Sequence, residues 1–548
     1  MSFNKESDFE QALVDLLTSK HGWESTVLKN YDEKQLIRNW ADILYENNRS
    51  VDRLNDYPLT DGEMQQIIEQ IESLKTPLRL NAFINGGSVS VKRDNPDDVA
   101  HFGKEVSLKI YDRREIAAGQ SRYQIVRQPK FPTKSKMLND RRGDVMLLIN
   151  GMPVIHIELK KSGVPVSQAA HQIEKYASEG VFTGLFSLVQ IFVAMNPEET
   201  VYFANPGPEG KFNPNYYFHW ADFYNEPIND WKKICSTLLY IPLAHEMIGY
   251  YTVADDSDGI LKVMRSYQYY AANRISDRVA KTKWGENNQL GGYIWHTTGS
   301  GKTMTSFKSA QLISTSKNAD KVVFLMDRIE LGVQSLREYR NFAGAGLTEQ
   351  QKENTVQETE DTYVLINKLK SSNPADALIV TSIQKMSNIS DDNAALKVAD
   401  IDTINQKRLV FIVDECHRDV FGEMMLTIKN TFPHALFFGF TGTPIQNENQ
   451  KKNEGITTSV FGDELHRYSI ADGIRDKNVL GFDPYQVLTF RDADVRQVVA
   501  LDMAKAKTVE DALADEDKKE VFLYYMNEVP MAGSQNADGT YTRGIEDY

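Results

Sequence analysis

One glycine-rich segment constrains the fold of this chain more than any other feature of its sequence. Residues 291–310 read GGYIWHTTGSGKTMTSFKSA, in which an apolar stretch enters a Gly-Ser-Gly-Lys-Thr turn and a run compatible with a helix follows. Glycines in such a turn let backbone amides approach phosphates at the helix N-terminus, where Lys302 reaches the terminal phosphates and Thr303 coordinates Mg²⁺. A phosphate-binding turn is therefore predicted at Thr298, Gly299, Ser300, Gly301, Lys302 and Thr303. The full signature has glycine where His296 stands, and a chance match to the short pattern is the alternative.

Two further apolar segments have the pattern of strands in a parallel sheet. RLVFIVDECHRD is continuously apolar through Val413 and ends in Asp414 and Glu415, at the edge where parallel strands meet a ligand. There Asp414 would hold Mg²⁺, and Glu415 would orient or deprotonate an attacking water. ALFFGF runs into Thr-Gly-Thr-Pro at 441–444, a turn placed to sense bound nucleotide. Strand, loop, helix, strand and turn in this order predict an α/β nucleotide-binding fold.

The segment 143–161, GDVMLLINGMPVIHIELKK, has two apolar runs around Asn150-Gly151 and predicts an antiparallel hairpin. On the second strand one face carries His156, Glu158 and Lys160, and Asp144 opens the first strand across from them. Two carboxylates and an ammonium suit phosphodiester hydrolysis, because the acids hold a divalent ion such as Mg²⁺ and the lysine neutralises developing charge. The predicted catalytic side chains are Asp144, Glu158 and Lys160, and the predicted metal ligands are Asp144, Glu158 and the carbonyl of Leu159. The alternative is the solvated face of an ordinary amphipathic strand.

Charge distribution also bears on this choice. The formal net charge of −14 argues against a nucleic-acid partner, because phosphate neutralisation needs Lys and Arg. Directly before Asp144, however, one acid, Asp140, is outnumbered by the cations Arg127, Lys130, Lys134, Lys136, Arg141 and Arg142. In the following helix-like segment, SQAAHQIEKYASEG, Gln172 and Tyr176 lie one turn apart on a shared face. The alternative for the basic run is a solvated charged loop.

The 548 residues are too many for one hydrophobic core, which stops growing at roughly 250 to 300 residues, so at least two domains are expected. Two cysteines, Cys235 and Cys416, give no disulfide framework and are expected in the core, which fits a reducing cytoplasm. The N-terminus lacks a secretory signal. The longest apolar stretch, Val181 to Met195, is too short to span a membrane and is expected to be a buried strand or helix.

The hairpin and helix resemble the PD-(D/E)xK nuclease superfamily and the extra motif of its RecB-like branch. The matching residues are Asp144, Glu158 and Lys160, followed by Gln172-x-x-x-Tyr176. Gly143 stands where that family usually has proline. The resemblance implies that an acid on the first helix assists, and Glu10 is the candidate; a solvent-facing helix position is the alternative.

The second set of motifs resembles superfamily 2 helicases and translocases, with Asp-Glu-Cys-His at 414–417 and Thr-Gly-Thr-Pro at 441–444. This resemblance implies that the residues around Gln268 grip adenine and that His417 links the second motif to the third. The motifs VVFLMDR and VTSIQKM, at 322–328 and 380–386, follow the nucleic-acid backbone in that family. The implied contacts for DNA or coupling are Gln172, Tyr176, Arg328, Thr381, Gln384, His417, Thr441 and Thr443. Any of the motor residues is alternatively a strand end or a helix cap.

The order of the two parts resembles the motor and restriction subunit of type I restriction enzymes over residues 5–485, through phrases such as IELKKSGVPV, FIVDECHR and GFTGTPI. The resemblance implies ATP-dependent translocation and Mg²⁺-dependent cleavage of duplex DNA, together with methyltransferase and sequence-recognition subunits. No Gln-x-x-Gly-Arg-x-x-Arg pattern follows residue 444, so an incomplete motor is expected. The expected regions are a nuclease domain (1–250), a RecA-like lobe with the ATP site (251–470) and a connector with the start of a second lobe (471–548). Residues 255–260 are the expected linker, and a loose C-terminal stretch is expected.

Two other functions remain open from the sequence. One is a translocase or remodeller whose nuclease-like domain only clamps DNA or docks partners. The other is a non-enzymatic assembly module that binds nucleotide without turnover. The first predicts no metal-dependent cutting of DNA, and the second predicts no ATP turnover.

Overall fold

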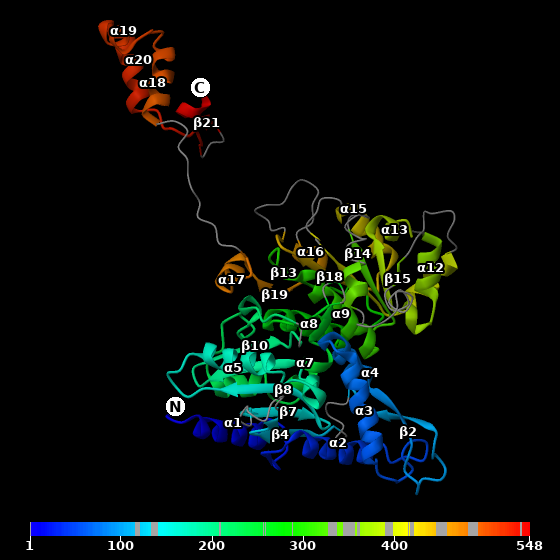
Figure 1. Cartoon of the computed structure of the whole chain (residues 1–548). Helices are drawn as coiled ribbons and strands as arrows, with labels where there is room; N and C mark the ends of the chain where they lie inside the picture. The colour runs from blue at the N-terminus through cyan, green and yellow to red at the C-terminus, as the bar shows by residue number, and fades with distance from the viewer. Residues whose placement is uncertain are drawn as a thin grey trace. The chain divides into compact units, whose positions relative to one another are not determined.

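The structure is a computed structural model, which describes residues 2–114, 121–132, 141–207, 210–255, 257, 259–287, 289–326, 337–342, 357–358, 362–389, 398–414, 416, 421–444, 457–479, 492–536 and 540–548. Contacts within the chain divide it into two compact units, Met1–Val479 and Leu480–Tyr548. The larger unit contains two large sheets, one before residue 205 and one after residue 291 (Figure 1). The domain boundaries expected from the sequence stay a prediction.

A six-stranded mixed sheet forms the core of the first half of the larger unit. In spatial order its strands are β1 (Leu28–Lys29), β4 (Tyr123–Arg127), β7 (Val145–Ile149), β8 (Met152–Leu159), β9 (Ile191–Asn196) and β10 (Glu199–Ala204). Strand β8 runs antiparallel to β7 and parallel to β9, and both α1 (Glu6–Lys20) and α5 (Val166–Ser178) pack against it. Every residue of β8 is buried, so the solvated strand face offered as the alternative is wrong here.

The predicted hairpin is confirmed as β7 and β8. Asn150 and Gly151 join the strands with φ of 50° and 83°, the left-handed values that a two-residue hairpin turn requires. A Cβ on Gly151 would lie 2.8 Å from Cδ1 of Trp40, so packing as well as φ favours glycine. The apolar stretch at 181–195 forms the 3-10 helix η1 (Gly184–Leu188) and most of buried β9, as expected. In the described part of the chain, no helix is both long and apolar enough to span a membrane.

Smaller elements surround this sheet. They are α2 (Glu33–Asn47), α3 (Asp61–Leu74), α4 (Pro77–Gly86), β2 (Ser88–Lys92), β3 (Glu105–Lys109), β5 (Lys130–Phe131), β6 (Arg141–Arg142), η2 (Pro214–Tyr216), α6 (Trp231–Thr237) and α7 (Leu243–Gly249). Strand β11 (Thr252–Asp255) then pairs with β12 (Ile260–Val263), and Asp255 lies opposite Ile260. The expected linker at 255–260 is therefore wrong, because Asp and Gly, which are common in linkers, also suit the tight turn of a hairpin.

A seven-stranded sheet, parallel at every described strand pair, forms the core of the second half. In spatial order its strands are β15 (Gln357–Glu358), β16 (Leu378–Ser382), β14 (Lys321–Met326), β17 (Leu409–Val413), β18 (Leu436–Thr441), β13 (Gly292–His296) and β19 (Glu464–Tyr468). Adjacent residues of one strand enter different apolar clusters, with Val323 in one and Val322 in the other, so both faces are covered. The predicted α/β fold with a RecA-like parallel sheet is confirmed.

Along the chain, most helices of this half connect one strand of the parallel sheet to another, and in space they lie beside the sheet (Figure 1). They are α8 (Ser266–Ala280), α9 (Lys302–Ser316), α12 (Thr362–Lys370), α13 (Ile383–Ser387), α14 (Val398–Asn405), α15 (Phe421–Thr431), α16 (Thr457–Phe461) and α17 (Ile470–Arg475), with the 3-10 helix η3 (Pro374–Asp376).

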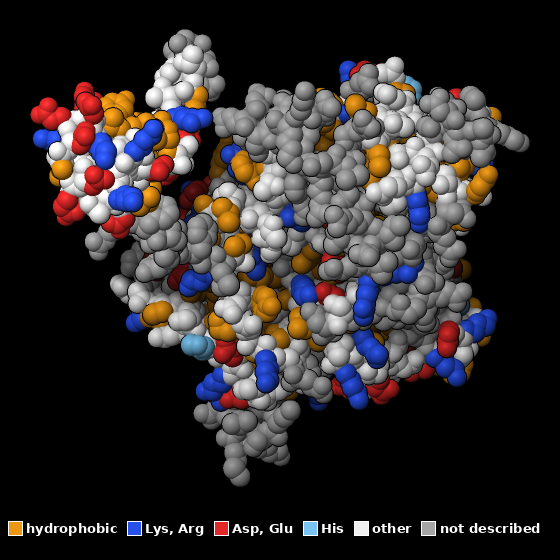
Figure 2. Space-filling model, turned by 90° about the horizontal axis from the view of Figure 1, so that it is seen from above, with side chains coloured by type: hydrophobic (Ala, Val, Ile, Leu, Met, Phe, Trp, Pro, Cys, Tyr) orange, Lys and Arg blue, Asp and Glu red, His pale blue; other side chains and the backbone are white. Residues whose placement is uncertain are grey.

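The smaller unit has a core of its own. Its described elements are α18 (Asp492–Met503), α19 (Val509–Ala514), α20 (Glu516–Asn527), β20 (Ser534–Gln535), β21 (Tyr541–Thr542) and η5 (Ile545–Asp547). Ala500, Ala504, Ala512 and Phe522 form the buried cluster. Apolar and acidic side chains lie side by side on the surface of this unit (Figure 2). The expectation of a loose C-terminal stretch is wrong for its described residues, because β20 pairs with β21 and Ile545 is buried.

Candidate nuclease and nucleotide sites

The register of β7 and β8 brings the two predicted acids of the nuclease site together. Val145 pairs with Ile157, so Asp144, the preceding residue, lies opposite Glu158. The backbone amide of Leu159 donates a hydrogen bond to Asp144 Oδ2 at 2.7 Å, which fixes the Asp144 carboxylate against the end of β8. Gly143 precedes this acid, and a Cβ there would lie 2.5 Å from Cε1 of His156. The contact explains why glycine stands at this position.

Burial makes this pair of carboxylates costly to ionise. Burial, and then the neighbouring Glu158 carboxylate, raise the pKa of Asp144 well above its usual range. Burial raises the pKa of Glu158 to about 8, although the charge of Lys160 opposes the shift. His156 Nε2 lies 3.2 Å from Glu158 Oε2, and burial lowers the pKa of His156 to about 4, so its imidazole is neutral at pH 7. An added positive charge would therefore stabilise the charged form of this pair.

The donor set of this site fits a divalent cation. Glu158 is fully buried, yet its Oε1 accepts no hydrogen bond from the described residues. Among those residues there is also no cluster of three or more His, Cys, Asp or Glu side chains with metal-binding geometry. A cation held here would therefore take Asp144 and Glu158 together with a backbone oxygen, for which the carbonyl of Leu159, the residue after Glu158, is the candidate. Hard oxygen donors of this kind suit Mg²⁺.

A chain of hydrogen bonds positions Lys160. Its Nζ donates to the Leu159 carbonyl at 2.9 Å and to Gln172 Oε1 at 2.8 Å. Gln172 Nε2 donates to the Tyr176 hydroxyl at 2.6 Å, and that hydroxyl donates to the Arg142 carbonyl at 2.8 Å. The structure therefore brings Gln172 and Tyr176 of α5 to the lysine, as their shared helix face suggested.

Helix α1 contributes two acids to this site. Glu10 is buried and pairs with Arg127 Nε at 2.6 Å, so the solvent-facing alternative is wrong; its charge adds to the rise in the pKa of Asp144. Glu6, which the sequence argument missed, places Oε1 3.6 Å from Lys160 Nζ. The signal was its position four residues before Glu10, which puts both acids on one helix face. In the basic segment 127–142, the cations Lys134 and Lys136 and the acid Asp140 lie outside the described residues.

The three nucleotide motifs meet at one edge of the parallel sheet. Strands β17, β18 and β13 are neighbours in that order, and each predicted motif follows the carboxyl end of one of them. Helix α9 begins at Lys302, and Gly299 and Gly301 before it have φ of 81° and 78°. A Cβ on Gly442, in the third motif, would lie 3.4 Å from Thr298 Oγ1 and 3.6 Å from Lys302 Nζ. The third motif therefore lies against the phosphate-binding turn.

The other predicted motor residues are only partly placed. Asp414 follows β17 directly, and Thr441 ends β18, where its Oγ1 accepts a hydrogen bond from the Thr443 amide at 3.0 Å. Thr381 is buried in β16, and Gln384 lies on α13. Glu415, His417 and Arg328 lie outside the described residues. The assigned roles of all these residues stay predictions. Cys235 and Cys416 are both buried, as expected.

His296, which replaces a glycine of the full signature, belongs to the core. It is fully buried, and its Nε2 lies 3.0 Å from Nδ1 of His466 in β19. His466 Nε2 in turn lies 3.1 Å from the carbonyl oxygen of Phe223. The histidine at position 296 therefore links β13 to β19 and, through His466, to the first half of the unit.

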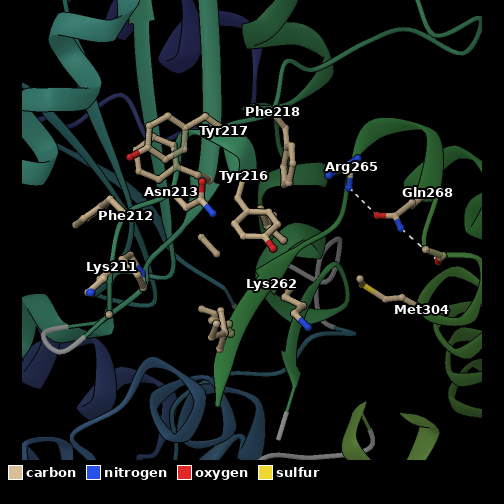
Figure 3. A pocket seen from close by; sticks show the side chains of 18 of the residues that line it. Lys211, Phe212, Asn213, Tyr216, Tyr217, Phe218, Lys262, Arg265, Gln268 and Met304 are labelled. Atoms are coloured by element: carbon tan, nitrogen blue, oxygen red, sulfur yellow. Dashed lines mark hydrogen bonds between the residues drawn. The ribbon is translucent and has the colours of Figure 1, made fainter. Parts of the chain in front are cut away.

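A cavity of about 430 Å³ opens beside the phosphate-binding turn (Figure 3). Gln268 forms part of its wall: Oε1 accepts from the Arg265 amide at 3.0 Å, and Nε2 donates to the Ser300 carbonyl at 3.2 Å. The facing wall comes from the first half of the unit and includes the aromatic side chains of Phe212, Tyr216, Tyr217 and Phe218. Sequence reasoning missed this wall, although the aromatic run FNPNYYF at 212–218 was a visible signal.

Comparisons with known proteins match the regions of the chain that contain both sites. Two family models match, "Type I restriction enzyme R protein N terminus" over residues 4–211 and "SWI2/SNF2 ATPase" over residues 267–520. The chain is 36% identical over 491 residues to a type I restriction enzyme endonuclease subunit of Staphylococcus saprophyticus, covering 90% of this chain and 48% of that protein. It is 34% identical, with the same coverage, to such a subunit of Staphylococcus aureus. The chain thus spans about half the length of these curated relatives.

A shorter relative is matched over most of its own length. It is the C-terminal part of a putative type I restriction enzyme endonuclease subunit of Mycoplasma pneumoniae, 39% identical over 180 residues, which cover 32% of this chain and 82% of that protein.

Proposed function

Because this chain belongs to the family of type I restriction enzyme endonuclease subunits, we propose that it carries the nuclease centre and a nucleotide-binding motor lobe of an enzyme that translocates and cleaves duplex DNA. Nuclease chemistry is assigned to the first half of the larger unit and ATP chemistry to the second. Both proposals rest on the geometry of the sites.

The observation that carries the nuclease assignment is the convergence of two acids and one lysine at the end of β8. Asp144 and Glu158 face each other, and Lys160 is held beside them by the Leu159 carbonyl and Gln172. An ammonium fixed at this point neutralises the charge that develops on a phosphate during attack. Neutral His156 holds one oxygen of Glu158 and leaves Oε1 for another ligand.

Asp144, Glu158 and the Leu159 carbonyl are the groups that would hold Mg²⁺. When bound, Mg²⁺ would polarise the phosphate and lower the pKa of the attacking water. The buried, mutually repelling carboxylates support this assignment, because each is stabilised in its charged form by a cation.

Replacing Lys160 tests the nuclease assignment. In the enzyme assembled with its partner subunits, Lys160→Ala is expected to reduce plasmid nicking by at least about 100-fold, because a preorganised charge at the reacting phosphate is lost. ATP hydrolysis should be unchanged. Lys161→Ala, which removes the adjacent exposed lysine, is the matched control and should cut like the wild type.

Two results would contradict the assignment. Normal nicking by Lys160→Ala would remove Lys160 from the chemistry. A wild-type enzyme that hydrolyses ATP but never cuts DNA with Mg²⁺ present would favour a clamp or docking role for this domain instead.

The nucleotide assignment rests on the phosphate-binding turn and the cavity beside it. We assign the phosphates and their Mg²⁺ to the backbone amides at the start of α9, Lys302 and Thr303, with Asp414 at the end of β17, two strands from β13. We assign adenine to the cavity that Gln268 and the aromatic side chains line. Lys302→Ala should abolish ATP hydrolysis in the assembled enzyme, and unchanged turnover would overturn this assignment.

The partners follow from the family. We assign duplex DNA as the substrate, and methyltransferase and sequence-recognition subunits as partners that supply site specificity. The two buried free cysteines are compatible with the reducing environment of the cytoplasm.

A further inference from the structure

A cleft of about 400 Å³ lies on the surface along α5 and includes Gln172, the residue that accepts the hydrogen bond from Lys160. Its walls are Arg141, Gln168, His171, Gln172, Lys175 and Tyr176. Each of these side chains carries a hydrogen-bond donor, and none is a carboxylate. In a protein with a formal net charge of −14, a cleft of this composition is selective for an anionic ligand.

Two acids on α5 or directly after it already have partners, and one of them, Glu179, neutralises Arg141 of the cleft wall. Glu179 accepts both guanidinium hydrogen bonds of Arg141, at 2.7 and 2.8 Å. Glu174 accepts a hydrogen bond from the Tyr217 hydroxyl at 2.6 Å. Among the residues that the structure describes, no carboxylate lies within ion-pair distance of Lys175, so Lys175 supplies the cleft with an uncompensated charge.

The cleft is continuous with the nuclease centre. Gln172 and Tyr176 form part of its wall, and Gln172 Oε1 also accepts the hydrogen bond from Lys160 Nζ. A ligand that lies along the cleft therefore contacts Gln172, the residue that holds Lys160. From Gln168 to Lys175 the helix rises about 10 Å, whereas phosphates of one strand follow every ~3.4 Å of duplex axis. At least two neighbouring phosphates fit along this face.

We propose that this cleft holds the sugar-phosphate backbone of the DNA strand that is cut, with Lys175 and His171 on phosphates next to the scissile one. This inference rests on the proposed nuclease function. Gln168 and His171 are exposed and lie one helical turn apart, so both side chains can donate hydrogen bonds to the same DNA strand. Arg141, which Glu179 holds in place, borders the cleft. The contacts read no base sequence, since they reach only the backbone.

The salt dependence of DNA binding tests the proposal. A fluorescent duplex without a recognition sequence is titrated with the chain in increasing KCl, without ATP or Mg²⁺. Each phosphate contact contributes about −0.9 to the slope of log K against log salt, so Lys175→Ala should make the slope shallower by about one unit. Lys175→Arg should keep the wild-type slope.

Lys104→Ala is the matched control, because Lys104 is an exposed lysine in the segment before β3, on a different part of the same half. It should keep the wild-type slope. In the assembled enzyme, Lys175→Ala should also raise the DNA concentration needed for half-maximal cleavage by several-fold, with ATP hydrolysis unchanged.

The outcomes separate the inference from the proposed function. Equal slopes for wild type, Lys104→Ala and Lys175→Ala, in an enzyme that still cuts DNA, overturn the cleft and leave the nuclease standing. A wild type that never cuts DNA overturns both the nuclease function and the assignment of the cut strand to this cleft.

Discussion

At the scale of single residues, neutral groups position the two acids and the lysine of the proposed nuclease centre. One backbone amide holds Asp144, one imidazole holds Glu158, and one amide side chain holds Lys160. Lys160 is a long, flexible side chain that loses rotamer freedom when it is fixed, and Gln172 supplies part of the compensating interaction. Gln172 is therefore a positioning residue that acts through Lys160.

Removal of Gln172 is predicted to impair cleavage without affecting the motor. Gln172→Ala removes the hydrogen bonds to Lys160 and to Tyr176, and a small misplacement of a catalytic group costs up to about 100-fold in rate. We expect nicking by the assembled enzyme to fall by about 10- to 100-fold, mainly in kcat, and ATP hydrolysis to stay at the wild-type rate.

Gln65→Ala provides the control, because Gln65 also makes a hydrogen bond to a residue four positions later on its helix, Glu69 at 3.2 Å. That variant should cut normally. A Gln172→Ala enzyme with wild-type kcat would show that Lys160 needs no help from α5.

At the scale of elements, buried histidines join helices and strands that are distant in the sequence. His245 of α7 is fully buried, with Nδ1 3.1 Å from the Tyr123 hydroxyl of β4 and Nε2 3.1 Å from the Asp112 carbonyl. Its ring stacks on Tyr111 at 4.7 Å between centroids. Burial lowers the pKa of His245 to about 4, so α7 is attached to the sheet by a neutral imidazole.

This contact predicts a loss of stability in acid. The folded protein takes up a proton at His245 only near pH 4, whereas the unfolded chain takes one up near pH 6.5, so acidification between these values favours unfolding. From pH 7 to pH 5 this site alone should cost about 2 kcal/mol of unfolding free energy.

Urea unfolding at pH 7 and pH 5 measures the effect. His245→Gln should be less stable than wild type at pH 7, because buried hydrogen bonds are lost, but its further loss at pH 5 should be smaller by about 2 kcal/mol. His219→Gln, at a partly exposed histidine, should lose as much as the wild type. Equal losses in all three proteins would contradict the assignment.

At the scale of the whole larger unit, the two halves make direct contacts and together line the cavity beside the phosphate-binding turn. Asn225 Nδ2 donates to the Arg467 carbonyl at 2.8 Å, and Arg475 Nη2 donates to the Asn225 carbonyl at 2.6 Å. The cavity beside Gly301 is completed by aromatic side chains from before residue 220. Residues of the first half therefore line the cavity in which we propose that the nucleotide base binds.

Tyr216 tests this arrangement. It is 59% exposed and lines the cavity, so stacking on a base is expected to contribute near the lower end of the ~1–3 kcal/mol seen for such contacts. Tyr216→Ala should weaken ATP binding by about 10-fold in a calorimetric titration. Inorganic triphosphate, which has no base, should bind Tyr216→Ala and wild type equally.

Tyr224→Ala removes an exposed tyrosine of the neighbouring segment, outside the cavity, and should bind ATP normally. If Tyr216→Ala weakens ATP and inorganic triphosphate alike, the cavity does not hold the base.

Local patterns in the sequence predicted much of the fold. The Asn150-Gly151 turn and the apolar runs beside it define the hairpin, because only a few residues tolerate left-handed backbone. The phosphate-binding turn and the strand ending at Val413 are equally local signals. By contrast, Asp and Gly at 255–260 suggested a linker, and only the pairing of β11 with β12 shows a hairpin. Composition alone does not separate a turn from a linker.

By itself, the sequence determined which strands, turns and acids this protein has, because backbone propensity and side-chain chemistry are local properties. Tertiary structure decided the electrostatics. Burial beneath α1 and α5 raises the pKa of Glu158 to about 8. The packing of α1 against β8 brings Glu6 close to Lys160 and buries Glu10 in the core. The aromatic wall of the nucleotide cavity also belongs to tertiary structure. Exposure and charge interactions depend on which distant segments cover a residue, and that information is not local to any motif.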